Sequence, residues 1–91
     1  MPEINWTKKA SKQLSALPKK EGDAIEDAVE ELAKWPEIPH LKVEKLTDDK
    51  EKRMKLVVGN YRVLWKIEKG QPVVIDILEV LRRTSTTYKK R

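Results

Sequence analysis

Side chains that could act on an anionic substrate are concentrated between residues 53 and 88. Lys55 and Arg62 flank a short turn, Arg82 follows an apolar run, and Tyr88 comes six residues later. Cleavage of RNA by its own 2′-hydroxyl needs a base, positive charge at the phosphorane-like transition state, and an acid for the 5′-oxygen. A lysine can be the base where nearby cations lower its pKa, and arginine can stabilise the developing charge. A tyrosine can stack on a nucleobase or orient it.

Other catalytic signatures are missing from the sequence. It contains no Gly-rich phosphate loop, no zinc-ligand spacing and no cysteine. The single histidine, His40, follows Pro39 in a predicted loop and is better explained as a surface residue than as a catalytic one. An acidic row at helical spacing is better explained as a solvated helix face than as a metal site: Glu26, Asp27, Glu30 and Glu31. We therefore expect no metal and no cofactor.

The net charge of +5 is unevenly distributed along the chain. Residues 1–50 carry 9 Lys and Arg against 11 Asp and Glu, whereas residues 51–91 carry 11 against 4. A solvated, lysine-rich surface would explain the charge equally well. However, Arg53, Lys55 and Arg62 fall on adjacent predicted strands, where like charges repel one another. The pattern therefore favours a function that keeps them there, with a polyanionic partner such as nucleic acid.

Three consecutive strands are predicted to carry these cations. Val58-Gly59-Asn60-Tyr61 predicts a two-residue hairpin turn of type II′, with Gly at the first central position. Residues alternate in character on both sides of the turn, and a second turn at Lys69-Gly70 leads into residues 72–81. That run is apolar on both faces, which is typical of a central or well-covered strand.

Two helices are predicted before the strands. Asn5 or Thr7 can cap the first helix, which begins near Lys8. Pro18 ends that helix and is well placed to open a second one, which runs to about Trp35. Its predicted buried stripe consists of Ala24, Ile25, Ala28, Val29, Leu32 and Ala33.

The elements together predict a small α+β domain that spans residues 1–91. Residues 3–6 can add an edge strand and residues 41–46 a short extended piece, and the overall order is β-α-α-β-β-β. Two helices would pack on one face of a small antiparallel sheet and leave the other face open and basic. The core candidates on the sheet are Met54, Leu56, Tyr61, Val63, Trp65, Ile75 and Ile77.

Composition also bears on where the protein works. The absence of cysteine favours a reducing compartment. Residues 1–6 lack the apolar core of a signal peptide, and no run approaches the roughly 20 apolar residues that a membrane span needs. We expect a cytoplasmic protein without a membrane partner.

The hairpin at residues 55–63, the apolar last strand, and the ending from Arg82-Arg83 to Tyr88 resemble the RelE/ParE superfamily of toxin–antitoxin toxins. The helical pair fits as well, so the resemblance spans nearly the whole chain. RelE-type members are ribosome-dependent endoribonucleases that cut messenger RNA in the A site. The resemblance therefore implies a metal-independent nuclease that inhibits translation, whose partners are the ribosome, mRNA and a cognate antitoxin.

The resemblance also implies residue roles. Lys55 would be the base, Arg62 would stabilise transition-state charge, Arg82 would be the acid or a second clamp, and Tyr88 would orient the substrate. Arg82 and Arg83 are adjacent, so the register of the strand end decides which of them enters the site. Further RNA or ribosome contacts would come from Lys52, Arg53, Lys66, Arg83, Lys89 and Lys90.

Two alternatives stay open within the same superfamily. ParE-type members share the fold but act on DNA gyrase, and an inactive toxin-like binding module is also compatible with the sequence. Retention of Lys55, Arg62, Arg82 and Tyr88 together favours the nuclease.

Overall fold

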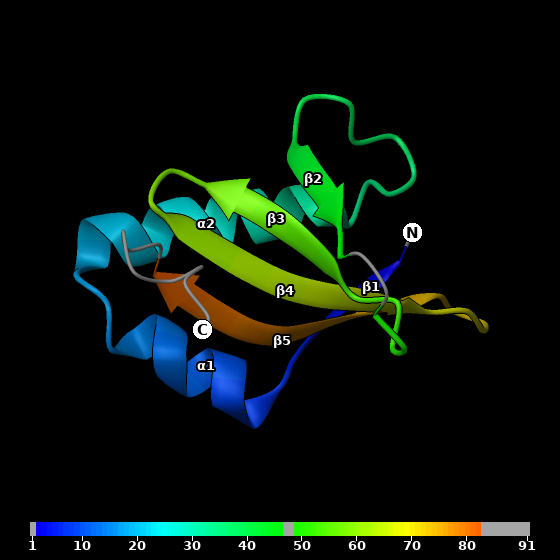
Figure 1. The fold of residues 1–91 in the computed structure, drawn as a ribbon, viewed down its shortest axis with the longest axis horizontal. Helices are drawn as coiled ribbons and strands as arrows, with labels where there is room; N and C mark the ends of the chain where they lie inside the picture. The colour runs from blue at the N-terminus through cyan, green and yellow to red at the C-terminus, as the bar shows by residue number, and fades with distance from the viewer. Residues whose placement is uncertain (1, 47–48, 83–91) are drawn as a thin grey trace.

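The computed structural model describes residues 2–46 and 49–82 (Figure 1). In chain order, the elements are β1 (Glu3–Trp6), α1 (Lys8–Ser15), α2 (Lys19–Leu32), β2 (Lys42–Lys45), β3 (Met54–Val58), β4 (Tyr61–Glu68) and β5 (Val74–Arg82). Neither described helix has the length and apolar character needed to span a bilayer.

The strands form one five-stranded sheet in the order β1-β5-β4-β3-β2. Strands β2 to β5 pair antiparallel, whereas β1 pairs parallel with β5 and places Ile4 opposite Ile75. The predicted α+β class, with two helices packed on a small sheet, is confirmed. The sheet differs from the prediction in two details: the extended piece at residues 42–45 is a full edge strand, and the parallel β1 makes the sheet mixed.

The β3–β4 hairpin has the predicted two-residue turn. Val58 lies opposite Tyr61, and Gly59 adopts φ +55°, a left-handed conformation that glycine reaches at little cost. Because the strands alternate strictly on both sides of this turn, Leu56, Val63 and Trp65 all face the helices. The turn therefore fixes which side chains of β3 and β4 are left on the other face.

The helices begin where predicted. Thr7 is the N-cap of α1, and its Oγ1 accepts a hydrogen bond from the Ala10 N–H at 3.3 Å. Pro18 precedes the first residue of α2, but this helix ends at Leu32, about one turn before the predicted end. One residue of the predicted stripe was wrong: Ala24 is exposed, because the 100° rotation per residue turns it away from its buried neighbour Ile25.

The hydrophobic core lies between α2 and the sheet, with α1 packed alongside β5 (Figure 1). Six of the seven predicted sheet positions are buried, and the seventh, Met54, is partly buried against them. Trp65 is the largest side chain that is completely buried. The full cluster consists of Ala10, Ile25, Val29, Leu32, Leu56, Tyr61, Val63, Trp65, Ile75, Ile77 and Val80.

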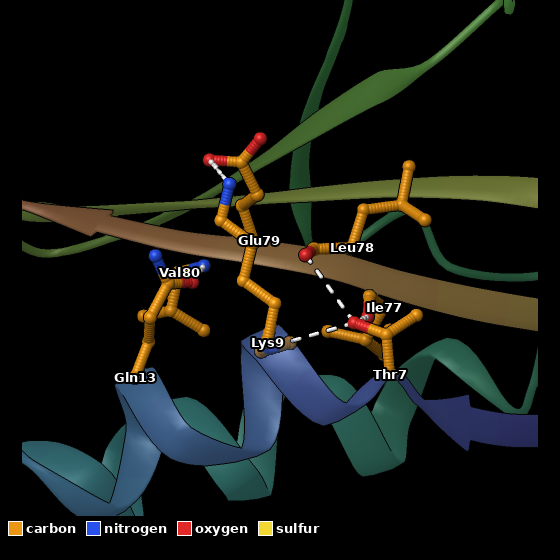
Figure 2. A network of polar contacts seen from close by, with 8 residues as sticks. Thr7, Lys9, Gln13, Ile77, Leu78, Glu79 and Val80 are labelled. Atoms are coloured by element: carbon orange, nitrogen blue, oxygen red, sulfur yellow. Dashed lines mark hydrogen bonds and ion pairs between the residues drawn. The ribbon is translucent and has the colours of Figure 1, made fainter.

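Helix α1 continues along the edge of β5 beyond the point where β1 ends (Figure 2). The Thr7 hydroxyl donates to the Ile77 carbonyl oxygen at 2.7 Å, and the Leu78 carbonyl oxygen lies 3.3 Å away. Gln13 Oε1 accepts the backbone N–H of Val80 at 2.7 Å. The Thr7 hydroxyl thus adds a second bond to the Ile77 carbonyl oxygen, which also accepts the Thr7 backbone N–H at 3.1 Å. Gln13 satisfies an edge group of β5 beyond the end of β1, which blocks pairing with another strand there.

Replacing Thr7 by alanine should lower the free energy of unfolding by about 1–2 kcal/mol. The change removes both the helix cap and the hydrogen bond to Ile77. Urea denaturation followed by circular dichroism measures the loss, and Thr7→Ser, which keeps the hydroxyl, is the control. Equal stability of the wild-type, alanine and serine proteins would contradict this role for the hydroxyl.

Candidate functional site

The face of the sheet away from the core, here called the open face, carries the cations predicted for the site. Pairing registers place the following described residues on it: Glu3, Asn5, Lys42, Glu44, Lys55, Val57, Arg62, Leu64, Lys66, Glu68, Val74, Asp76, Glu79 and Leu81. Lys55, Arg62 and Lys66 are all half-buried. The predicted placement of Lys55 and Arg62 on the face of the sheet away from the helices is confirmed.

Lys55 and Arg62 are diagonal neighbours across the β3–β4 ladder. Lys55 lies opposite Leu64, and Arg62, two residues earlier on β4, lies opposite Val57. Such diagonal positions are about 7–8 Å apart, within reach of long side chains. Arg62 Nη1 donates to the carbonyl oxygens of Gly59 at 3.1 Å and Tyr61 at 2.9 Å, which anchors the guanidinium at the hairpin turn.

The open face is not the uniformly basic surface that the sequence predicted. Its described cations are Lys42, Lys55, Arg62 and Lys66, whereas its acidic residues are Glu3, Glu44, Glu68, Asp76 and Glu79. The prediction was wrong because it considered the cations of β3 and β4 alone. Strands β1, β2 and β5 contribute four of the five carboxylates, and Glu68 at the end of β4 contributes the fifth. Positive charge is therefore local to the end of the face near the β3–β4 turn.

Glu44 is a site residue that the sequence reasoning missed. It lies opposite Lys55, and its Oε1 is 3.1 Å from Lys55 Nζ. The hydrogen bond from Lys55 is the main cause that lowers the pKa of Glu44, and the fields of Lys42 and Arg62 add to it. The only signal in the sequence was an acidic residue in a short extended segment, which does not give a register.

The Glu44 carboxyl should titrate below its usual range, and Lys55→Gln should move its pKa upward toward that range. The pKa of Glu44 should rise in this variant because the bond from Lys55 stabilises the ionised carboxylate. Any stability from this pair is therefore present above the unfolded pKa and lost as the pH falls through the folded one. Carbon-13 NMR of the Glu side chains measures the shift. The matched control is Lys12→Gln on α1, and an equal Glu44 pKa in wild type and Lys55→Gln would contradict the pairing.

Arg53 and Lys52 lie at the other end of β3. Arg53 forms an ion pair with Asp49, with Nη2 to Oδ1 at 2.8 Å and the Arg53 backbone N–H to Oδ2 at 2.7 Å. These bonds lower the pKa of Asp49. Arg53 is four residues from Val57, the partner of Arg62, which corresponds to roughly 13 Å along a strand. These two predicted contacts therefore do not converge with Arg62.

Lys52 and Arg53 instead line a hollow of about 580 Å³ beside the start of β3. Its apolar lining includes side chains that pack against the core, so it opens on the helix side of the sheet. The hollow is lined by Trp35, Lys45, Leu46, Asp49, Glu51, Lys52, Arg53, Met54, Ile67 and Lys69. This hollow and the predicted catalytic pair, Lys55 and Arg62, are thus in different places.

Lys66 belongs to an acidic end of the open face. Its Nζ lies 3.8 Å from Glu68 Oε2, and it pairs across the ladder with the buried Asp76. Asn5 Nδ2 donates to Asp76 Oδ1 at 2.8 Å, and a hydrogen bond with Asp76 raises the pKa of Glu68. Lys66 is therefore balanced by nearby carboxyl groups.

Arg82 is exposed and occupies a register position on the helix side of the sheet, not on the open face. A bulge in β5 causes this, because Leu64 pairs with Glu79 while Trp65 pairs with Ile77, which leaves Leu78 as an extra residue. The extra residue reverses the alternation after it and sets Arg82 opposite Tyr61.

The Tyr61 hydroxyl beside Arg82 donates a hydrogen bond to Glu21 of α2. That bond and burial raise the pKa of Tyr61. The positive charge of Arg82 opposes this shift, which indicates that Arg82 lies near the hydroxyl.

On the open face, the residue of β5 opposite Arg62 is the exposed Leu81. The structure thus brings Lys55 and Arg62 together but not Arg82. The other predicted residues, Arg83, Tyr88, Lys89 and Lys90, lie outside the described residues.

Comparison with known families gives a match over most of the chain. The sequence model of the ParE toxin of type II toxin–antitoxin systems (parDE) matches residues 4–86. A search of curated protein sequences gave no significant match.

Several solved structures have the same fold. The archaeal RelE–RelB complex from Pyrococcus horikoshii matches with a TM-score of 0.73 and 23% identity, over 92% of this chain and 97% of that chain. The RelBE2 toxin–antitoxin complex of Mycobacterium tuberculosis gives 0.73 and 24%, over 91% and 100%. A YoeB/ParE toxin from Agrobacterium tumefaciens gives 0.72 and 13%, over 90% and 99%. At these identities, the matches establish a shared fold.

Proposed function

Because this chain belongs to the ParE toxin family of type II toxin–antitoxin systems, within the RelE/ParE superfamily, we propose that it is a RelE-like toxin that cleaves messenger RNA on the ribosome. In this role it would bind in the ribosomal A site, cut the message by attack of a 2′-hydroxyl, and stop translation in the cytoplasm. The chemistry would use the protein's own side chains.

The observation that carries this proposal is the diagonal placement of Lys55 and Arg62 on the open face of the β3–β4 hairpin. Both side chains are partly accessible, and the ladder holds them within reach of one phosphate. Arg62 would stabilise the transition-state charge from a position fixed by two carbonyl oxygens. Lys55 would act as the base that accepts the proton of the 2′-hydroxyl.

The remaining roles are proposed on the resemblance. Arg82 would clamp the phosphate by reaching around the end of the sheet, since its register position is on the helix side. Tyr88 would orient the substrate. Lys52, Arg53 and Lys66 would contact ribosomal RNA or message away from the scissile bond, because they do not lie beside Arg62.

Inhibition of DNA gyrase is a second candidate. It is favoured by the family model that matches residues 4–86, which describes ParE toxins. The mixed charge of the open face also suits a protein partner better than a uniformly basic face would. This candidate assigns no cleavage to Lys55 or Arg62, and the two functions therefore differ in what the same substitutions should do.

We also propose that a separate antitoxin chain neutralises this one. The two complexes with the same fold each contain an antitoxin. The hollow beside β3 suits part of such a chain, because Trp35, Leu46 and Met54 give it an apolar floor, and Lys45 and Lys69 lie among its lining residues. An extended segment with apolar anchors and acidic residues would complement it.

Binding to ribosomes should weaken steeply as salt rises. Each phosphate neutralised by a cation adds about −0.7 to −0.9 to the slope of log K against log salt. Co-sedimentation with ribosomes between low and moderate salt measures the slope, and Arg62→Ala should make it shallower, with Lys12→Ala on α1 as the charge-matched control. A flat response would count against the open face as the ribosome-binding surface.

A further inference from the structure

Glu44 sits among three cations on the open face. It lies opposite Lys55 on the neighbouring strand, and Oε1 to Nζ is 3.1 Å. One row further toward the β3–β4 turn, Lys42 lies opposite Val57, which in turn lies opposite Arg62. The carboxylate is therefore within the space that the three positive side chains border.

The backbone geometry sets the size of this arrangement. Neighbouring strands are about 4.8 Å apart, so Lys42 and Arg62 lie roughly 10 Å apart on either side of Val57. Lys55 is two residues from Val57 along β3, or roughly 7 Å, on the same face. Three long cationic side chains on such a triangle can converge on one anion near its centre.

Glu44 already responds to all three cations. Lys55 has the largest effect in lowering the pKa of Glu44, and Lys42 and Arg62 act in the same direction. The Glu44 side chain is nevertheless 49% exposed, and an ion pair so accessible adds little to the stability of the fold. The main effect of this ion pair is therefore on which other anions the three cations can bind.

A carboxylate and a nucleic-acid phosphate compete for the same donors. Both are anionic oxygen acceptors, and ammonium and guanidinium groups bind either through charge-assisted hydrogen bonds. A ligand phosphate that reaches Lys55 must therefore displace Glu44 or share the lysine with it. The salt bridge between Glu44 and Lys55 would therefore reduce the affinity of the site for anions that bind weakly.

We propose that Lys42, Lys55 and Arg62 form a phosphate subsite for the RNA backbone, and that Glu44 occupies this subsite in the free chain until a phosphate replaces it. The identity of the ligand as RNA rests on the proposed function, whereas the subsite itself rests on the geometry of β2, β3 and β4. Lys42 thereby joins the site, and Glu44 becomes a residue that sets its affinity.

The test is binding of a short, fluorescently labelled single-stranded RNA to the isolated chain, with 2′-O-methyl groups to prevent cleavage. Glu44→Gln should tighten binding about fivefold, the effect expected from releasing one exposed ion pair. Lys42→Ala should weaken binding and make the salt slope shallower by about 0.7, the loss of one phosphate contact to a single strand. Glu30→Gln on α2 and Lys12→Ala on α1 are the charge-matched controls and should leave binding nearly unchanged.

Inorganic phosphate, added at constant ionic strength, distinguishes a site for free phosphate from a site for the phosphates of RNA. If it displaces the RNA at low millimolar concentration, the subsite serves a free anion and the assignment to RNA is overturned. If RNA stays bound, the nucleic-acid backbone is the ligand.

The outcomes also separate this inference from the proposed nuclease. Unchanged or weaker RNA binding by Glu44→Gln overturns the subsite even if the wild type cuts message. Loss of cleavage in Glu44→Gln at unchanged affinity also overturns it, because the carboxylate then acts in the chemistry. Tighter binding by Glu44→Gln, together with no cleavage by the wild-type chain, supports the subsite and rejects the nuclease.

Discussion

Arg62→Ala should reduce cleavage of ribosome-bound message by about 10²–10³, the usual cost of removing one transition-state donor. The guanidinium is accessible on the open face and is held at the turn by the carbonyl oxygens of Gly59 and Tyr61. It is thus preorganised to meet charge that develops on a phosphate. The rate is measured as the appearance of new message ends in single-turnover conditions.

The same variant should keep its fold, because a partly accessible charge on the open face contributes little to stability. Thermal unfolding of Arg62→Ala and wild type should therefore nearly coincide. Lys12→Ala removes an equal charge on α1, outside the sheet, and should cut at the wild-type rate. Arg62→Lys keeps the charge but loses the planar fork, so it should recover only part of the activity. Cleavage by Arg62→Ala within a few-fold of wild type would remove Arg62 from the chemistry.

Trp65→Ala should lower the free energy of unfolding by about 3–5 kcal/mol, the range observed for large aromatic truncations in cores. Trp65 is completely buried and faces α2 from the centre of the sheet, paired with Met54 on β3 and Ile77 on β5. For a domain of this size, the midpoint of thermal unfolding should fall by at least about 10 °C. Calorimetry or urea denaturation measures the loss.

Trp65→Phe is the informative control. Among the residues that the structure describes, the Trp65 indole Nε1–H has no hydrogen-bond partner, and a buried donor without a partner is itself unfavourable. Phenylalanine keeps an aromatic ring and removes that donor, so it should cost clearly less than alanine. A phenylalanine variant as unstable as the alanine variant would mean that the indole N–H is satisfied in solution.

The parts of the fold that were predictable from sequence are those set by local pattern. The turn at Gly59 and the alternation around it specify the β3–β4 hairpin, and Thr7 and Pro18 mark the starts of both helices. The shared face of Lys55 and Arg62 follows from the same hairpin, because two strands joined by a two-residue turn have a fixed register.

Three features depended on contacts between distant segments and could not be predicted in this way. The parallel pairing of β1 with β5 joins residues more than 70 positions apart, and no local pattern encodes it. The placement of Glu44 beside Lys55 required the register of β2 on β3. The side of the sheet that Arg82 occupies was reversed by the bulge at Leu78, whose sequence is an ordinary apolar strand.

The charge of the open face illustrates the same limit. The sequence places most of the positive charge after residue 50, and β3 and β4 do carry it. Yet Glu44 from β2 and Glu79 from β5 arrive on the same face through pairing. A charge count along the chain therefore indicated the correct hairpin but not the electrostatic balance around it.

The most direct test of the nuclease is primer extension on a message held in a translating ribosome, run beside a gyrase supercoiling assay with the same protein. We expect new message ends with the wild-type chain, loss of these ends with Arg62→Ala, and unaffected supercoiling. Uncut message together with blocked supercoiling would contradict the RNA mechanism and establish the ParE-like function in its place.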